Sequence, residues 1–167
     1  MSLNPLRSNT TIGIFLFRMN QKKGIKKMNH VEERGISFTV KSGLRSVRNS
    51  LMDYAQDTNA YVAGLNIMDY VDPDERDCSE GFVLYGQAGI LEGMKYPMYG
   101  RYTSWNVQII LIDSDPGRNG ECEVILVAIG DKRLGNNLSI RCSEEHRNKI
   151  ENYLNDCFYC TKSARIF

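Results

Sequence analysis

The order of periodic segments along the chain constrains its fold more than any single motif does. Residues 36–40 alternate between apolar and polar side chains, which is the period of a half-buried strand. A helix pattern follows directly, with Ser42 placed to cap its first turn. The apolar face of this predicted helix consists of Leu44, Val47, Leu51, Tyr54 and Ala55. The regular structure therefore begins with a strand followed by an amphipathic helix.

A run of strand patterns occupies the middle of the chain. These patterns cover residues 60–70, 81–85, 105–111, 122–129 and 138–142. Ile110 and Ile112 place apolar residues on the second face of the third pattern, so we predict a central strand that is covered on both sides. Residues 113–120 predict a hairpin connection. Four spaced glycines predict a bend or bulge, and they are Gly86, Gly89, Gly93 and Gly100.

A second helix pattern closes the chain. Ser143 is placed to cap it, with Glu144 and Glu145 in a first turn where the helix dipole favours anions. Its apolar face consists of Ile150, Tyr153, Leu154, Cys157 and Phe158. This order predicts a single α+β domain with a mostly antiparallel sheet of about five to seven strands. We expect the C-terminal helix to pack on the sheet in a helix-grip-like arrangement or a roll, and a barrel closed by that helix also fits the order.

Charge divides the chain into two parts. Residues 1–27 contain six basic residues and no acidic one, so residues 28–167 contain 15 basic and 20 acidic residues and carry a net charge of −5. The codons of residues 22–28 can also spell a purine-rich bacterial ribosome-binding site just before Met28. We therefore expect residues 1–27 to be a non-native or flexible basic extension and residues 28–167 to be the domain. The alternatives are a basic tail for an anionic partner and a first strand at residues 11–18.

The bulk properties argue against membranes, nucleic acids and export. The apolar stretch at residues 12–17 is too short to cross a membrane. The mildly acidic body is a poor nucleic-acid surface. No small-residue cleavage pattern follows Phe17, and the five cysteines are an odd number. We therefore expect reduced thiols in a bacterial cytoplasm.

The cysteines and histidines give no strong catalytic or metal signal. Cys157 and Cys160 form a Cys-x-x-Cys motif at the C-terminal end of the predicted helix, where the dipole does not favour a thiolate, and Cys157 falls on the core face. His30, His146 and the other cysteines lack the paired spacing of zinc ligands. We expect His146 on the helix surface. The sequence predicts no cofactor and no metal, and it favours a non-catalytic protein.

One aromatic series is the best candidate for a binding surface. It consists of Tyr96, Tyr99, Tyr102 and Trp105, with Arg101 among them. Aromatic rings beside cations form stacking surfaces for a base, a sugar or a partner protein. The alternative is that these rings fill the gap between the sheet and the helices.

Two functions remain open from the sequence. The first is non-catalytic binding of a small apolar or aromatic ligand between the sheet and the C-terminal helix. The second is a protein-interaction or regulatory accessory module that uses an exposed aromatic face, with another protein or with a second copy of itself as the partner. An enclosed cavity would favour the first. A packed interior beside an exposed aromatic patch would favour the second.

Overall fold

The computed structural model describes residues 30–65, 78–88, 103–113, 120–133 and 137–167. The N-terminal extension expected at residues 1–27 lies outside these ranges. So do the glycines of the predicted bend at residues 89, 93 and 100, and most of the hairpin connection between residues 113 and 120.

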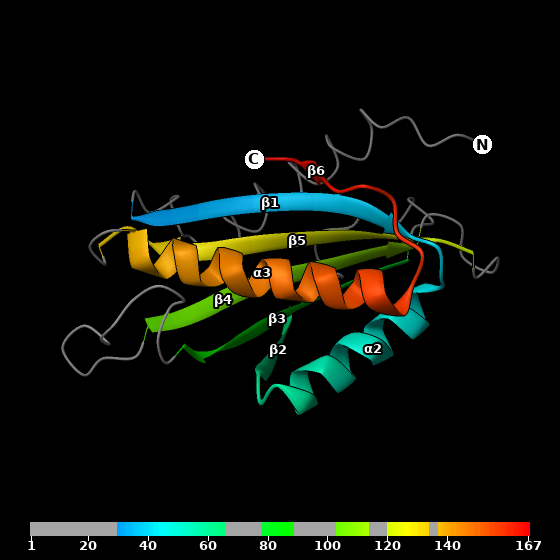
Figure 1. Ribbon diagram of the computed structural model, residues 1–167, viewed down its shortest axis with the longest axis horizontal. Helices are drawn as coiled ribbons and strands as arrows, with labels where there is room; N and C mark the ends of the chain where they lie inside the picture. Colours follow the sequence, from blue (N-terminus) through cyan, green and yellow to red (C-terminus); the bar gives the residue numbers. More distant parts are fainter. Residues whose placement is uncertain (1–29, 66–77, 89–102, 114–119, 134–136) are drawn as a thin grey trace.

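Six strands form one antiparallel sheet in the order β2-β3-β4-β5-β1-β6 (Figure 1). The strands are β1 (Val31–Val40), β2 (Tyr61–Leu65), β3 (Cys78–Ala88), β4 (Thr103–Asp113), β5 (Cys122–Asp131) and β6 (Ala164–Arg165). The first strand therefore pairs with the last long one, and β2 and β6 lie at opposite ends of the order. The predicted antiparallel α+β fold is confirmed, and the sheet is open rather than closed into a barrel.

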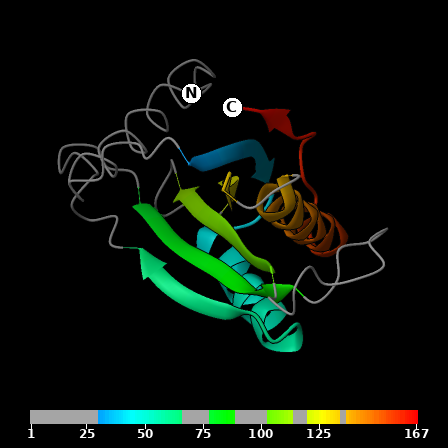
Figure 2. The ribbon, with the colours of Figure 1, turned by 90° about the vertical axis from the view of Figure 1, so that its left-hand side faces the viewer.

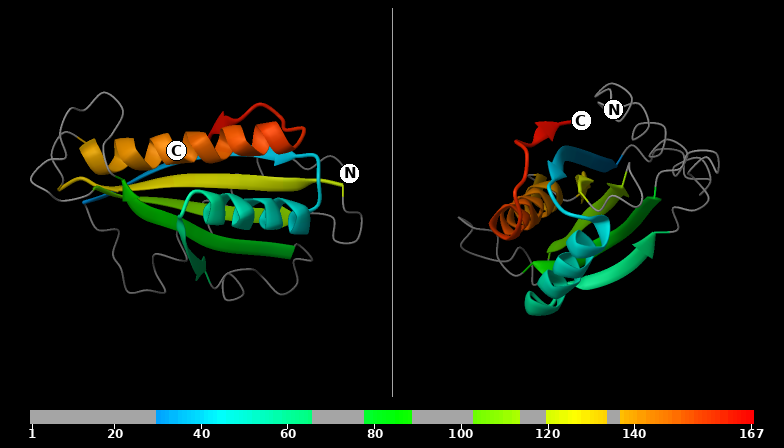
Figure 3. Two further views of the ribbon diagram at one scale, coloured as in Figure 1. Left: turned by 60° about the horizontal axis from the view of Figure 1, so that its bottom comes forward. Right: turned by 90° about the vertical axis from the view of Figure 1, so that its right-hand side faces the viewer.

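Two helices pack on one face of this sheet. They are α2 (Leu44–Asp57), which links β1 to β2, and α3 (Leu138–Cys157), which follows β5. Figure 2 and Figure 3 show both helices on the same side of the twisted sheet. The rings of Tyr54 on α2 and Tyr153 on α3 join the helices, with their centroids 4.9 Å apart.

The hydrophobic core fills the layer between the sheet and the helices. Its fully buried side chains include Leu51, Leu84, Leu111, Ile150 and Leu154. A fully buried aliphatic side chain stabilises a fold by about 1.5–3 kcal/mol relative to exposure. The five apolar residues predicted for the face of α2 are all buried. On α3, by contrast, Cys157 is exposed, so its predicted core position is wrong.

The central strands are also buried on the face that points away from the helices. Ile110 on β4 pairs with Ile125 on β5, and Val127 lies two residues further on the same face. All three side chains are buried, which confirms for Ile110 the prediction of a strand covered on both sides.

Both predicted helix caps are wrong. The N-cap of α2 is Gly43, whose backbone is extended, rather than Ser42. The long helix begins at Leu138, with Asn137 in the left-handed region before it, so Ser143 lies inside α3 and Glu144 and Glu145 are not in its first turn. Residues 138–142 are therefore the first turn and a half of α3 and not a strand.

The misassigned segment, residues 138–142, is buried at one of its two polar positions as well as at its apolar ones. Leu138, Ile140 and Cys142 alternate with polar residues, yet Ser139 is buried beside them. Its Oγ accepts a hydrogen bond from the backbone nitrogen of Asp131, 2.9 Å away. A serine that bonds to the sheet counts as polar in a sequence pattern, so the helical period is hidden and the alternation imitates a strand.

The first half of α3 lies unusually close to the sheet. A Cβ atom at Gly130 would stand 2.5 Å from the backbone nitrogen of Ile140, so only glycine permits this approach. Ser143 completes the junction, because its Oγ accepts a hydrogen bond from the Asn106 nitrogen (3.0 Å) and donates one to the Ile129 carbonyl oxygen (2.6 Å). These bonds fix the position of α3 over β4 and β5.

Candidate functional site

Trp105 is the member of the predicted aromatic surface that the structure describes. It lies on β4, it is 4% exposed, and its ring faces α3. Tyr96, Tyr99, Arg101 and Tyr102 fall outside the described residues. The aromatic surface as a whole therefore stays a prediction, and Trp105 itself fills space between the sheet and a helix.

His146 of α3 stacks on Trp105. The two ring centroids are 3.9 Å apart and the ring planes are tilted by only 6°. Burial lowers the pKa of His146 to about 4, and the charge of Lys149 acts in the same direction. His146 is thus a neutral, partly buried ring at neutral pH, and the expectation of an isolated surface histidine is wrong.

Gly86 makes room for the Trp105 ring. It lies on β3 opposite Trp105 in the strand register. A Cβ atom at this position would stand 2.9 Å from Trp105 Nε1. The glycine spacing in this region thus reflects, at Gly86, the close approach of an indole to a neighbouring strand rather than a turn.

Three of the free thiols, Cys122, Cys142 and Cys160, have a raised pKa. Burial raises the pKa of Cys122 to about 12 and that of Cys142 to about 11. Cys160 is half-buried, its pKa is also raised by burial, and its backbone forms a bridge with Val40. A thiol needs a lowered pKa to act as a nucleophile near neutral pH, so these three residues are suited to packing.

A charged network ties α3 to β1. The Arg147 Nη1 atom donates to the backbone oxygen of Arg34 at 2.9 Å, and the Arg34 guanidinium bridges Glu32 (2.8 Å) and Glu144 (3.0 Å). Burial lowers the pKa of Arg147. Within the described residues, Arg147 Nε and Glu151 Oε2 are buried and have no hydrogen-bond partner in the protein.

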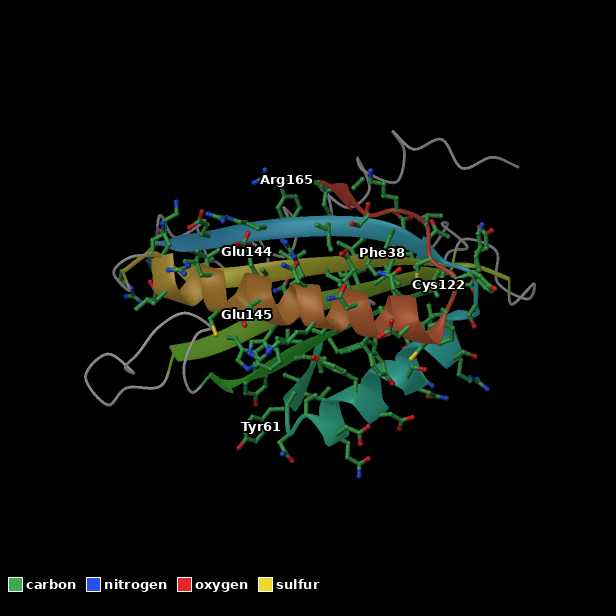
Figure 4. The ribbon with its side chains drawn as sticks, in the orientation of Figure 1. Phe38, Tyr61, Cys122, Glu144, Glu145 and Arg165 are labelled. Carbon is green, nitrogen blue, oxygen red and sulfur yellow. The ribbon has the colours of Figure 1, made fainter. Side chains whose placement is uncertain are left out.

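A different surface exposes aromatic and apolar side chains together. We define the β2 edge as residues Tyr61–Leu65 with the neighbouring Tyr85 of β3. The exposed fractions are 62% for Tyr61, 44% for Val62 and 38% for Tyr85. The rings of Tyr61 and Tyr85 stack across the two strands with centroids 5.4 Å apart. In Figure 4, Tyr61 lies at the lower margin of the molecule, well away from Arg165 at the upper margin.

The β2 edge is also open along its backbone. In the described part of the chain β2 pairs with β3 on one side, and β2 ends the strand order. Among the described residues, apart from Gly64 and its two neighbours in the chain, no atom lies within 4 Å of the position that a Cβ of Gly64 would occupy. The five residues Tyr61–Leu65 carry no charge and no proline. An edge whose outward amides and carbonyls pair with no other described strand can accept another strand.

The opposite edge of the sheet is closed by the C-terminal tail, which we define as residues 159–167. The nitrogens of Lys41 and Gly35 donate to the carbonyl oxygens of Tyr159 (2.8 Å) and Phe167 (3.1 Å). Between these ends, the Thr161 nitrogen donates to the Thr39 carbonyl oxygen, and the Thr39 nitrogen donates to Thr161 Oγ1. Arg165 of β6 pairs with Ile36 of β1. The tail thus pairs with the backbone of the chain from Gly35 to Lys41 at the outer side of β1.

Sequence reasoning predicted the β2 strand but not the β2 edge. The alternation that includes Tyr61 and Ala63 indicates a strand, and β2 confirms it up to Leu65. Alternation implies that one face is buried, however, and residues 61–64 are exposed on both faces. The sequence signal for an exposed pairing edge is the lack of charged residues in β2. This signal can be interpreted only when the strand order shows that β2 is an edge strand.

No protein-family model, no curated protein and no solved structure matches the chain. Within the described residues, no helix is long and apolar enough to span a membrane. The same residues contain no group of three or more His, Cys, Asp or Glu side chains that could hold a metal ion.

Proposed function

We propose that the protein is a non-catalytic interaction module that binds a partner protein by strand addition at the β2 edge. The observation that carries this proposal is that β2 has no neighbour on its outer side among the described strands and also exposes Tyr61 and Val62. In strand addition the main chain supplies the hydrogen bonds and side chains on alternating positions supply specificity. The stacked pair of Tyr61 and Tyr85 offers a rigid aromatic platform beside that backbone.

The packing of the core supports this proposal over ligand binding under α3. Ile150 and Leu154 of α3 are fully buried against sheet residues such as Leu111, so side chains occupy that layer in the described residues. Binding of a small apolar or aromatic ligand there stays a prediction. Native mass spectrometry of freshly purified protein tests this ligand-binding prediction, because a co-purifying small molecule would support it.

As part of the same proposal, the protein works in a bacterial cytoplasm. The support is that Cys122, Cys142, Cys157 and Cys160 are all free thiols, as expected in a reducing compartment. Thiol titration of the denatured protein, purified from its own cells with rapid alkylation, would contradict this placement if disulfides predominated.

A photo-crosslinking amino acid at position 61 tests the interaction directly. The matched control is the same amino acid at Tyr159, which is 87% exposed but lies on the C-terminal tail. After irradiation in cells, we expect protein adducts from position 61 and few from position 159. Adducts at position 61 that do not exceed those at position 159 would contradict the proposal.

A further inference from the structure

We propose that the partner at the β2 edge is a second copy of this chain, joined by an antiparallel pairing of β2 with β2 about a two-fold axis. This inference rests on the proposed function, because it names the occupant of the same edge. The sheet of one copy would then continue into the sheet of the other. A closed two-fold dimer uses the same surface twice, so the strand must be complementary to itself.

The residues of β2 meet that condition when the axis passes through Ala63. Tyr61 of one copy then lies opposite Leu65 of the other, and Val62 lies opposite Gly64. Each bulkier side chain therefore faces a smaller residue, and the small Ala63 lies on the axis. The space around Gly64 is open, which leaves room for Val62 of the second copy on the helix side of the sheet. Cross-strand neighbours of this kind are the unit of sheet stabilisation.

Charge favours self-pairing at this edge and opposes it at the other. Because Tyr61–Leu65 carry no ionised side chain, two copies bring no like charges together. The exposed side of the C-terminal tail carries Lys162 and Arg165. Two tails brought together would place these cations near each other, and charged edges are a common protection against pairing.

The size of the surface sets the strength of the dimer. A tyrosine buries on the order of 200 Å² when fully covered, so the exposed parts of Tyr61, Val62 and Tyr85 offer only a few hundred Å² per copy. Stable interfaces commonly bury about 800 Å² per partner. We therefore expect a weak dimer, with a dissociation constant on the order of 10 µM or weaker.

Sedimentation equilibrium over about 1–500 µM, a range chosen to bracket that constant, tests the inference. The average mass should rise from 19.1 kDa towards twice that value. Val62→Lys and, separately, Gly64→Glu should each weaken association at least about tenfold, since each places a charge in the pairing. Tyr159→Ser is the control and should associate like the wild type.

Mixing the two charged variants tests the register. In the proposed pairing Lys at position 62 of one variant faces Glu at position 64 of the other, so an equimolar mixture should recover most of the lost association. A mixture of Val62→Lys with Tyr159→Glu has the same charges in another place and should associate no more than a mixture of Val62→Lys with the wild type. Circular dichroism and thermal melts verify that each variant is folded, and Val62 and Gly64 are exposed enough for both to fold.

Three results would overturn the inference. One is a wild-type mass of 19.1 kDa at every concentration. Another is association that persists in both folded variants, and the third is a mixture that associates no better than its components. If the crosslinker at position 61 then captures a different protein, the interaction module stands and only the second copy is wrong. If it captures nothing, the proposed function fails as well.

Discussion

The two edge regions of the sheet differ in whether another described segment of the chain covers the edge strand. At the β1 edge, the C-terminal tail supplies hydrogen bonds from Lys41 to Gly35 and presents charged side chains outwards. At the β2 edge, the strand ends the described part of the sheet, carries no charged residue and exposes Tyr61. Within the described residues, the tail covers one edge and leaves the apolar β2 edge without a neighbouring strand, which is the contrast on which the proposed strand addition rests.

The register of the tail adds to this contrast. Thr161 is bonded to Thr39 and Ala164 is opposite Ser37, so three steps along the tail match two steps along β1. The extra residue is a bulge, which interrupts pairing on the outer side of the tail. The closed edge thus combines a short strand, a bulge and charges, and β2 has none of these three protections.

Removal of the C-terminal tail should lower the free energy of unfolding more than any other change predicted below. Deletion of residues 159–167 removes the pairing of β6 with β1, four further backbone hydrogen bonds and the bond to Thr161 Oγ1. At about 1 kcal/mol each, partly offset by the entropy that the freed chain regains, the free energy of unfolding should fall by roughly 2 kcal/mol. Urea denaturation measures it.

The same deletion opens a second edge. We expect the shortened protein to form species larger than dimers in sedimentation experiments, whereas the full chain stops at dimers. Equal stability of the two proteins, together with equal mass distributions, would show that the tail does not close the β1 edge.

Acid should lower the free energy of unfolding of the domain to which both edges belong. The pKa of His146 is about 4 in the folded protein and 6.5 in the unfolded chain, so the unfolded state binds the extra proton between these values. Stability contributed by the neutral ring is complete above pH 6.5 and is lost as the pH falls towards about 4. Allowing for partial exposure, we expect a loss of about 1–2 kcal/mol.

The measurement for His146 is the difference between two pH profiles of unfolding free energy. His146→Gln serves as the reference, because carboxylates that titrate in the same range contribute equally to both proteins. The difference should appear below pH 6.5. Parallel profiles for the two proteins would mean that the stack on Trp105 does not hold the histidine neutral.

The charged pair at the closed edge should have the smallest effect. Lys41 bonds to Glu121, and both side chains are about half exposed. Exposed pairs contribute little, so Lys41→Gln should change the free energy of unfolding by less than about 0.5 kcal/mol. A loss as large as that of the tail deletion would show that charge, rather than backbone pairing, secures the β1 edge.

The sequence predicted elements better than it predicted edges. The strand before α2, the buried face of α2 and the central position of β4 follow from local periodicity, because core packing imposes a regular spacing on apolar residues. The start of α3 did not follow, since Ser139 and Ser143 are buried by bonding to the sheet and look polar in the pattern.

The candidate site was less predictable than the fold for a related reason. The sequence pattern leaves open whether Trp105 belongs to a binding surface or fills the gap between the sheet and the helices, because its environment depends on His146, which lies 41 positions away in the sequence. The openness of β2 depends on the strand order, which places β1 and not β2 beside β5. Neither long-range pairing leaves a mark in the local sequence.

The most direct test of the difference between the edges is amide hydrogen exchange measured at low and high protein concentration. We predict that the outward amides of Tyr61–Leu65 exchange quickly in dilute protein and become protected as concentration rises. The amides of Gly35 and Lys41, which donate to the tail, should be protected at every concentration. Exchange in β2 that does not depend on concentration, or amides of Gly35 and Lys41 that exchange as fast as those of β2, would contradict this account.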